Sequence, residues 1–182
     1  MNKKLLTLYT KVDGIPTFKD SEIKNLWLRT QTEGFVDSLF FNMEKLDAND
    51  FLEEMQLDTT VLFIMRNNQD ETCGFAWLNN IRGGMFDGHF ALFKGFRGEI
   101  GFNLIKRACE EVLHIKAFGK YVFDVLVGVT PSSNMPACAL MRRIQAGWDN
   151  SYCVQKVKNY LYDYDSDSLV DAQICYLQRN EA

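Results

Sequence analysis

The chain has 182 residues, of which 47% are hydrophobic and 24% are charged, and its formal net charge is −4. This length and composition are typical of one folded domain with a real core, and they exclude a disordered chain. The negative charge argues against duplex nucleic acid as a partner, because binding to its phosphates favours a basic face.

The first third of the chain predicts a strand and two helices. Residues 5–9 indicate a strand, and the apolar run there is too short for a signal peptide or a membrane span. Ser21 is a candidate cap for a helix that continues to about Thr30. Residues 35–41 favour neither helix nor strand, and a second helix is expected to begin at Asp47.

The middle of the chain predicts three antiparallel strands joined by tight turns. These strands are expected over residues 60–66, 72–81 and 85–93. The first turn is rich in asparagine and aspartate at 67–70, and the second contains Gly83 and Gly84. A three-stranded antiparallel unit is therefore expected before the long helix that follows.

The second half predicts two helices and three further strands. An amphipathic helix is expected over residues 98–117, and the apolar segment 121–129 predicts a central strand covered on both faces. Asn134 can cap the second helix. Two long strands, at 152–162 and 169–177, are expected to close the chain as a hairpin.

This order of elements predicts a mixed α/β fold. We expect one domain over residues 1–182, with a central and mostly antiparallel sheet of about seven strands flanked by about four helices. The terminal hairpin would leave an exposed strand edge, which makes a homodimer possible. An unrelated α+β domain with the same order of elements is the plainest alternative.

The cysteine pattern favours a reducing compartment, so a cytoplasmic location is expected. The chain has five cysteines, an odd number, without a CxxC pair. Four of them fall in apolar patterns, where free cysteine behaves as a small hydrophobe: Cys73, Cys109, Cys138 and Cys175. The chain has only two histidines to activate a thiol, so a catalytic cysteine is not expected.

A short glycine turn opens the long helix. Its sequence is Arg97-Gly98-Glu99-Ile100-Gly101, directly after the strand at 85–93. The first turn of a helix has backbone N–H groups without helical partners, and such a helix start is a natural seat for a phosphate. The alternative is a plain turn that only caps the helix.

This arrangement resembles the GCN5-related N-acetyltransferase (GNAT) family over most of the chain, most firmly over residues 60–179. In that family the turn R/Q-x-x-G-x-G/A holds the pyrophosphate of acetyl-CoA, and here the spacing is one residue shorter. Asn134 and Ala137 match the family's Asn-x-x-Ala, and Gly147-Trp148 stands for its Gly-Phe. Met141 occupies the position of a tyrosine that commonly protonates the departing thiolate, and methionine has no proton to give.

The resemblance implies an acyl-CoA-dependent N-acyltransferase, with acetyl-CoA as co-substrate and an amine acceptor whose identity, small molecule or protein, stays open. A backbone N–H near Phe90 to Leu92 would polarise the thioester carbonyl, and Asn134 would contact the pantetheine arm. The implied cofactor-binding residues are Phe90, Leu92, Arg97, Gly98, Glu99, Ile100, Gly101 and Asn134. The carboxylate of Glu99 would repel a phosphate, so its side chain is expected to face solvent.

His89 is a candidate general base, because it lies in the strand that would carry the reacting carbonyl. The alternative is a histidine satisfied by its neighbours in a sheet. Arg142 and Arg143 are candidates for the cofactor's 3′-phosphate, with a solvated helix face as the alternative. His114 is expected to be exposed.

A second hypothesis is a GNAT-like protein that has lost catalysis and serves as a binding or virion-associated protein of a bacteriophage. The shortened glycine turn and Met141 favour it, and some phage-encoded GNAT-like proteins show a similar loss of family marks. No metal site is predicted. The acidic run at 163–167 lacks the central glycine and the terminal glutamate of a calcium loop.

Overall fold

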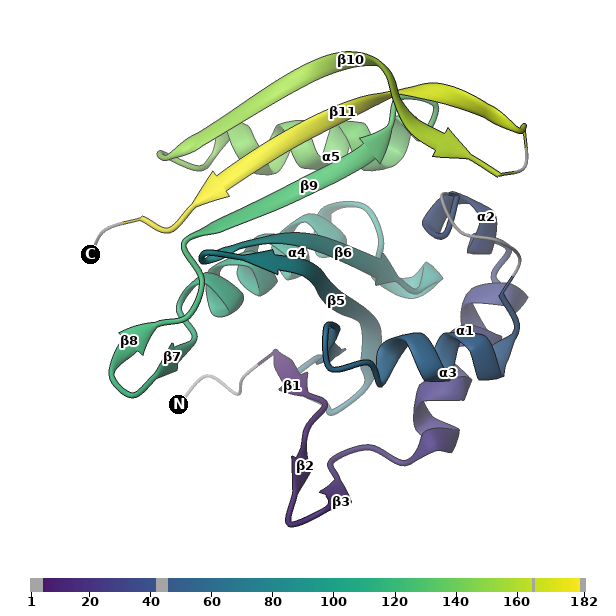
Figure 1. Ribbon diagram of the computed structural model, residues 1–182, viewed down its shortest axis with the longest axis vertical. Coiled ribbons are helices and arrows are strands. Elements are labelled where there is room, and N and C mark those ends of the chain that lie inside the picture. Colours follow the sequence, from purple (N-terminus) through teal and green to yellow (C-terminus); the bar gives the residue numbers. More distant parts are fainter. Residues whose placement is uncertain (1–4, 42–45, 165, 181–182) are drawn as a thin grey trace.

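The computed structural model describes residues 5–41, 46–164 and 166–180. Seven strands form one sheet in the order β1-β4-β5-β6-β9-β11-β10 (Figure 1). Their bounds are β1 Leu6–Leu8, β4 Val61–Arg66, β5 Thr72–Arg82, β6 Met85–Leu92, β9 Val125–Pro131, β10 Ser151–Asp163 and β11 Ser168–Gln178. All neighbours pair antiparallel except β6 and β9, which are parallel. The predicted mixed and mostly antiparallel sheet is confirmed.

Five α-helices and two small two-stranded sheets complete the described part. The helices are α1 Asp20–Thr32, α2 Val36–Leu39, α3 Ala48–Met55, α4 Glu99–Leu113 and α5 Met135–Ala146, and a 3₁₀ turn, η1, covers Lys94–Phe96. The small sheets are β2 Lys11–Val12 with β3 Ile15–Pro16, and β7 Lys116–Ala117 with β8 Lys120–Tyr121. Within the described residues, every helix falls short of the length and hydropathy that crossing a membrane demands.

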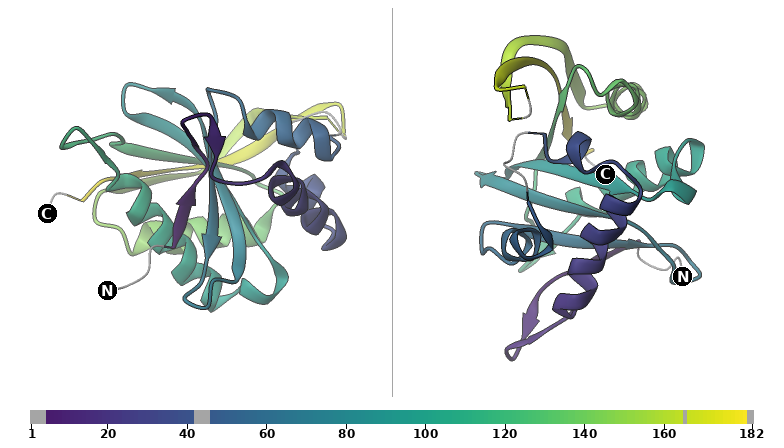
Figure 2. Two further views of the ribbon diagram at one scale, coloured as in Figure 1. Left: turned by 90° about the horizontal axis from the view of Figure 1, so that it is seen from below. Right: turned by 90° about the vertical axis from the view of Figure 1, so that its right-hand side faces the viewer.

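Both faces of the sheet are covered. The left view of Figure 2 shows α4 and α5 on one side of the sheet and α3 on the other. Strand β4 shows why: Phe63 and Met65 pack in the core under α4 and α5, whereas Leu62 and Ile64 pack in the core under α1 and α3. Successive side chains of a strand point to opposite faces, so a strand that is apolar throughout belongs between two layers.

Helix α3 begins where its sequence predicts. The Asp47 carboxylate accepts hydrogen bonds from the backbone N–H groups of Asn49, at 2.6 Å, and Asp50, at 3.0 Å. These bonds, the one from Asp50 first, lower the pKa of Asp47. The predicted cap of α1 is wrong. That helix begins at Asp20 with Lys19 in the cap position, and the Glu22 carboxylate accepts the Lys19 N–H at 2.9 Å.

The predicted boundary between the long helix and the following strand is also wrong. Helix α4 ends at Leu113, and β7 and β8 form a hairpin around Phe118, with φ 50°, and Gly119, with φ 77°. The Val122 N–H donates to the Ile115 carbonyl at 3.0 Å and closes this hairpin. Apolar residues in the segment therefore belong to an exposed turn, and strand β9 begins only at Val125.

The expectation of a free Cys175 is wrong. Cys153 and Cys175 lie directly opposite each other in the β10–β11 ladder and form a disulfide. The sequence alone does not indicate that these two cysteines, 22 residues apart, pair with each other, because the pairing depends on the register of the hairpin. Cys73, Cys109 and Cys138 are free and buried, as their apolar contexts predict. Burial raises the pKa of Cys109 to about 12, which suits a structural thiol.

Strands β6 and β9 stay together over a short distance only. Met85–Asp87 pair with Val125–Val127, and beyond that point β6 continues against β5 and β9 continues against β11. Figure 1 shows the two strands side by side at one end and diverging toward the other. The divergence separates the sheet into two parts and makes room for a site between them.

Candidate functional site

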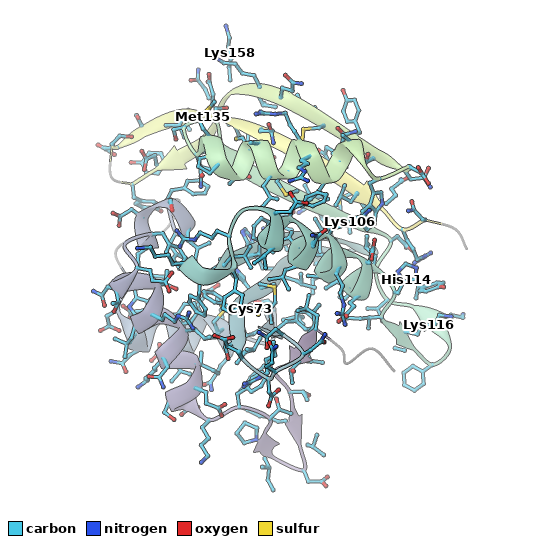
Figure 3. All side chains as sticks on the ribbon, turned by 180° about the vertical axis from the view of Figure 1, so that it is seen from behind. Cys73, Lys106, His114, Lys116, Met135 and Lys158 are labelled. Atoms are coloured by element: carbon cyan, nitrogen blue, oxygen red, sulfur yellow. A yellow bond between two sulfur atoms is a disulfide. The ribbon has the colours of Figure 1, made fainter. Side chains whose placement is uncertain are left out.

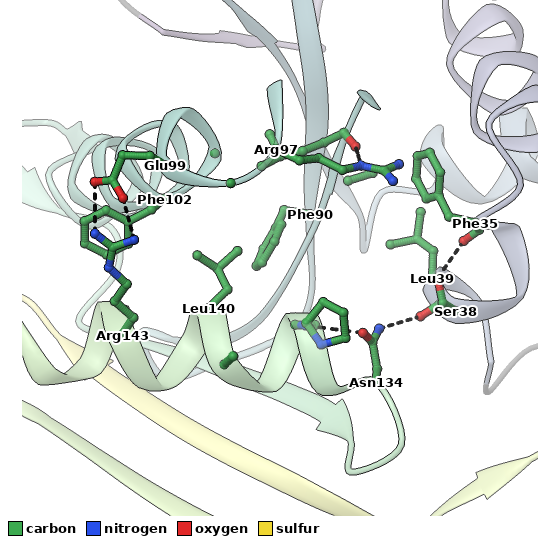
Figure 4. A pocket seen from close by; sticks show the side chains of 17 residues that line it. Phe35, Ser38, Leu39, Phe90, Arg97, Glu99, Phe102, Asn134, Leu140 and Arg143 are labelled. Atoms are coloured by element: carbon green, nitrogen blue, oxygen red, sulfur yellow. Dashed lines mark hydrogen bonds and ion pairs between the residues drawn. The ribbon is translucent and has the colours of Figure 1, made fainter. Parts of the chain in front are cut away.

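A pocket of about 570 Å³ lies between β6 with the start of α4 and helix α5 (Figure 4). Its walls come from β6, the start of α4, helix α5 and helix α2 with the residue before it. Phe90 of β6 and Leu140 of α5 project into the middle of the pocket, and Phe35 and Leu39 line the end near α2. A pocket of this size with mostly apolar walls and a few polar groups is typical of small-molecule and cofactor sites.

The glycine turn lies at the rim of this pocket. Gly98 is the residue before α4, with φ 69° and ψ −134°, and no side chain of the described residues caps this helix start. A Cβ on Gly101 would lie 2.8 Å from the Phe96 carbonyl oxygen and 2.7 Å from a methyl of Leu92. The turn therefore depends on glycine at both positions, and the backbone N–H groups of the first helical turn remain available for an anion.

The other residues of the predicted turn differ in where their side chains lie. Glu99 lines the pocket, whereas Ile100 is 56% exposed and does not. The Arg97 guanidinium donates through Nε to the Leu92 carbonyl at 3.0 Å and lies 3.4 Å from a carboxylate oxygen of Glu33. It also lies 4.5 Å from the centre of the Phe35 ring. Arg97 thus lines the pocket with part of its charge already balanced by Glu33.

An ion pair joins the two helices that border the pocket. Arg143 of α5 contacts the Glu99 carboxylate of α4 with both terminal nitrogens, at 2.7 and 2.9 Å (Figure 4). The Arg143 guanidinium also lies 3.9 Å from the centre of the Phe102 ring. The hydrogen bond lowers the pKa of Glu99 and raises the pKa of Arg143. Glu99 is largely exposed, as predicted, but the sequence carries no sign of its partner.

The backbone of β6 presents polar groups toward the pocket. The Phe93 N–H donates to the Cys73 carbonyl of β5 at 2.9 Å. Because backbone groups alternate in direction along a strand, those of Phe90 and Leu92 point the other way, toward the opening between β6 and β9. The Leu92 carbonyl is met there by Arg97. Phe90 also lines the pocket, so its N–H is a candidate donor to a ligand there.

Asn134 joins the pocket to the N-terminal helices. Its Oδ1 accepts the Ala137 N–H at 3.2 Å and caps α5, as predicted, and its Nδ2 donates to the Ser38 carbonyl at 3.4 Å (Figure 4). Pro136 occupies the first turn of α5, where its missing N–H leaves no gap in the helix. The cap therefore holds α2 and α5 at a fixed distance on the side of the pocket away from the Glu99–Arg143 pair.

His89 lies beside the pocket in a small cavity of about 70 Å³, which Phe90 and Met141 also line. Its ring stacks on Trp77 at 4.7 Å, and its Nε2 lies 3.1 Å from the Asn79 Oδ1. An amide oxygen only accepts, so Nε2 carries the hydrogen and Nδ1 keeps a lone pair. Burial lowers the pKa of His89 to about 4, although Asp87 opposes the shift. His89 is therefore neutral at physiological pH.

Met141, at the position of the family tyrosine, is buried and packs against Gly128. The other candidates lie elsewhere. Arg142 is not on a solvated face, because it donates to the buried Gln173 at 2.8 Å. His114 is exposed, as predicted, at the end of α4 beside the β7–β8 hairpin (Figure 3).

No cluster of three metal-ligating side chains occurs in the part of the chain that the structure describes. Of the acidic run considered for calcium, Asp165 lies outside the described residues, whereas Asp163 and Asp167 lie within them. The features of the pocket that could bind a ligand are therefore its apolar walls, the start of α4, and Arg97 and Arg143.

The fold is that of the GNAT acetyltransferases, as the sequence resemblance predicts. Spermidine N-acetyltransferase from Vibrio cholerae, solved in complex with CoA and spermine, has 14% identity and a TM-score of 0.65, with 97% of each chain covered. The ribosomal L7/L12 acetyltransferase RimL, in complex with coenzyme A, has 13% identity and a TM-score of 0.66, covering 97% of this chain and 96% of its own.

A third similar structure is the ribosomal-protein-S5-alanine acetyltransferase from Vibrio fischeri. It has 10% identity and a TM-score of 0.64, and the match covers 100% of this chain and 97% of the other. No protein-family model matches the sequence, and no curated protein does. At such identities the likeness establishes the fold, and function has to be argued from the site.

Proposed function

We propose that this protein is an acyl-CoA-dependent N-acyltransferase that transfers an acetyl group from acetyl-CoA to an amine. The observation that carries the proposal is the apolar pocket of about 570 Å³ between β6 and α5, with the uncapped start of α4 at its rim. Two of the similar structures, a spermidine and a ribosomal-protein acetyltransferase, were solved with CoA, and this supports the assignment.

The residues around the pocket fit the parts of acetyl-CoA. The backbone N–H groups of Glu99, Ile100 and Gly101 and the cation of Arg143 suit a diphosphate, because each can neutralise or hydrogen-bond an anionic oxygen. Phe90 and Leu140 form an apolar passage for the pantetheine arm. Leu92, Arg97, Gly98 and Asn134 complete the proposed cofactor-binding residues, with Asn134 ordering the end of the pocket near α2.

Acetyl-CoA supplies an activated thioester. In the transfer, the amine nitrogen forms a bond to the acetyl carbon, the carbon–sulfur bond breaks with its electron pair going to sulfur, and one amine proton is released. The Phe90 N–H, which points into the opening, would donate to the carbonyl oxygen as negative charge develops there. A preorganised donor of this kind stabilises the transition state more than the ground state.

His89 would position the amine. Its Nδ1 lone pair can accept a hydrogen bond from a neutral amine, while Nε2–H stays on Asn79 and Trp77 holds the ring plane. With a pKa of about 4, His89 binds protons weakly, so it would pass the amine proton to solvent rather than keep it. Met141 offers no proton, so the sulfur would receive its proton from water.

Titration calorimetry with acetyl-CoA tests the cofactor part of this proposal, and the release of free thiol in the presence of a panel of amines tests the transfer. We expect saturable binding of acetyl-CoA and amine-dependent thiol release. If millimolar acetyl-CoA gives no heat and protects no amide from hydrogen exchange, the transferase proposal is wrong.

The second candidate is a GNAT-like binding protein without catalysis, including a phage virion-associated protein. Buried Met141 and the Glu99–Arg143 pair favour it, because the first removes a proton donor and the second occupies a cation of the site. This reading predicts that no amine in the panel releases thiol and that a protein partner binds equally well with and without acetyl-CoA. The cytoplasmic location and the homodimer also stay predictions.

A further inference from the structure

The β7–β8 hairpin exposes an aromatic ring completely to solvent. Phe118 has an exposed fraction of 104%, the largest among the exposed large hydrophobic side chains of the described residues. The hairpin projects from the body of the molecule and lies between helix α4 and strand β9 in the sequence (Figure 1). Exposed apolar surface is unfavourable in water, and packing within the described chain does not account for a phenyl ring at this position.

The backbone of the turn does not account for phenylalanine either. Ala117 pairs with Lys120, so Phe118 and Gly119 alone form the turn. Their φ values of 50° and 77° are typical of a type I′ turn, in which both central residues are left-handed. Asn, Asp or Gly is favoured at the first of these positions, and a bulky side chain with positive φ is unusual there.

The β2–β3 hairpin makes the same kind of turn with the favoured residues. Val12 pairs with Ile15, and the two residues between them, Asp13 and Gly14, have φ values of 52° and 79°. Asp-Gly is one of the preferred pairs of a type I′ turn. Phe118 therefore holds a position that another residue would fill with less strain, and such positions are often functional.

Cations lie directly behind the aromatic tip. Lys116 and Lys120 are exposed, and they lie on opposite faces of the hairpin because successive pairs of a ladder alternate between its faces (Figure 3). The Lys116 Nζ lies 4.4 Å from the centre of the Tyr121 ring, and the Arg179 guanidinium lies 3.9 Å from it. The adjacent Asp124 carboxylate pairs with Arg179 at 2.9 Å. An apolar tip is thus followed by a band of positive charge.

The base of the hairpin is fixed to the rest of the molecule. The Asp124 N–H donates to the Gly84 carbonyl at 2.8 Å. Arg179 donates to the carbonyl of the buried Phe123, also at 2.8 Å. A tip that is already held in place loses little conformational freedom when it binds.

We propose that the β7–β8 hairpin binds the surface of an anionic lipid membrane. The Phe118 ring would enter the boundary between head groups and acyl chains, and Lys116 and Lys120 would contact the anionic head groups. The binding would be peripheral and reversible, because one ring and a few cations provide far less affinity than a membrane span. This inference is independent of the proposed acetyl transfer.

The shape of the hairpin favours a membrane over single-stranded nucleic acid. A narrow tip with cations on both faces suits a fluid surface that surrounds it from every side. Aromatic rings that stack on bases lie along a charged groove, whereas Phe118 lies at the end of a turn. The net charge of −4 disfavours an approach of other faces to anionic lipid, so the hairpin would also set the orientation of the protein.

Co-sedimentation with lipid vesicles tests the proposal. We expect the protein to bind vesicles of phosphatidylcholine and phosphatidylglycerol in equal parts more strongly than vesicles of phosphatidylcholine alone, and added salt should reduce this preference. Phe118→Asn should lower the partition coefficient about tenfold or more, as expected for a phenyl ring that is no longer buried. The urea midpoint of this variant should stay equal or rise, because asparagine suits the turn. A ring with a merely structural role would lower the midpoint instead.

The lysines are tested in the same way. Lys116→Gln and Lys120→Gln should each lower the partition coefficient on anionic vesicles about fivefold, which corresponds to the attraction of one lysine to such a surface. Lys11→Gln and Ile15→Thr are the matched controls, because they remove an exposed cation and an exposed apolar side chain from the β2–β3 hairpin. Neither control should change the partition coefficient.

Phe118→Trp reports whether the tip itself enters the lipid. The three native tryptophans are buried, so a change in emission on vesicle binding would come from the added indole. We expect its emission to shift to shorter wavelength on anionic vesicles and to be quenched by lipids with brominated acyl chains. Sedimentation without this shift, or sedimentation that Phe118→Asn leaves unchanged, would overturn the proposal.

Two further outcomes count against the membrane. If the protein binds neither kind of vesicle, the proposal is overturned. If it binds no vesicle but binds a single-stranded oligonucleotide, and Phe118→Asn abolishes that binding, the hairpin is a nucleic-acid contact instead. Acetyl-CoA binding should be the same in Phe118→Asn and wild type in every case, because the hairpin does not line the pocket.

Discussion

Gly98 shows how one residue can be required for backbone geometry alone. Its φ of 69° lies in the region that L side chains rarely adopt, and the space around its Cβ position is open. Gly98→Ala is expected to lower the free energy of unfolding by about 1–2 kcal/mol through backbone strain. The shifted helix start should also weaken acetyl-CoA binding, measured by titration calorimetry.

Gly95→Ala is the control for this change. A Cβ on Gly95 meets nothing within 4 Å, and its φ is not positive, so neither stability nor affinity should fall. Equal affinities for the two variants would show that the geometry of the turn is unrelated to cofactor binding.

His89 predicts a pH dependence of stability. Its pKa falls from about 6.5 to about 4 on folding, so the unfolded chain binds more protons between these values. The contribution of His89 to the free energy of unfolding is fully present above pH 6.5. It is lost as the pH falls toward 4, by about 2–3 kcal/mol in total. Urea unfolding of wild type and His89→Gln at several pH values measures the difference in slope.

His114→Gln serves as the comparison, because it removes an exposed histidine and leaves His89 in place. This variant should keep the wild-type fall in stability below pH 6.5. If His89→Gln shows the same fall as wild type, burial of His89 does not govern the acid sensitivity.

At the scale of elements, the Glu99–Arg143 ion pair has two consequences, one for the packing of α4 and one for cofactor binding. It holds α4 against α5, and it occupies the cation that the proposed diphosphate would need. Glu99→Gln is expected to strengthen acetyl-CoA binding about two- to fivefold, because a like charge near the phosphates is removed and Arg143 is released. Titration calorimetry measures the change.

Glu110→Gln removes another exposed carboxylate from the same helix and should leave the affinity unchanged. Weaker binding in Glu99→Gln would mean that the pair orders Arg143 for the cofactor instead of competing with it. Because both side chains are about half exposed or more, the stability of either variant should stay within about 0.5 kcal/mol of wild type.

Most elements were predictable because their signals are local. The cap at Asp47, the cap at Asn134 and the apolar run of β4 each lie within a few residues of sequence. The errors fall where a local signal was overridden, as at residues 114–121, where apolar side chains form an exposed hairpin instead of continuing a helix and a strand.

The contacts that complete the site were not predictable from one sequence. Glu99 pairs with Arg143 across 44 positions, and Cys153 pairs with Cys175 through the register of a bulged ladder. Such pairs depend on how elements pack, and no local pattern encodes them. The turn at 97–101 and the cap at Asn134 were predictable because a helix start and its cap involve residues that are close together in the sequence.

At the scale of the whole molecule, the pocket lies between β6, which belongs to one half of the sheet, and α5, which packs against the other half. One half carries β1, β4, β5 and β6, the other carries β9, β11 and β10, and the ladder that joins them is confined to Met85–Asp87 and Val125–Val127. A ligand in the pocket would contact β6 of one half and α5, which covers the other half. A ligand that binds only the folded state stabilises it by RT ln(1 + [L]/Kd), where [L] is the free ligand concentration.

Hydrogen exchange with and without acetyl-CoA tests this whole-molecule reading. Amides of Phe90 and Leu92, which point into the opening, and those at the start of α4 should exchange more slowly when acetyl-CoA is bound. Amides within the β4–β5 ladder already have partners across the sheet and should change less. Protection spread evenly over the β4–β5 and β5–β6 ladders, or confined to the β10–β11 hairpin, would place the ligand elsewhere.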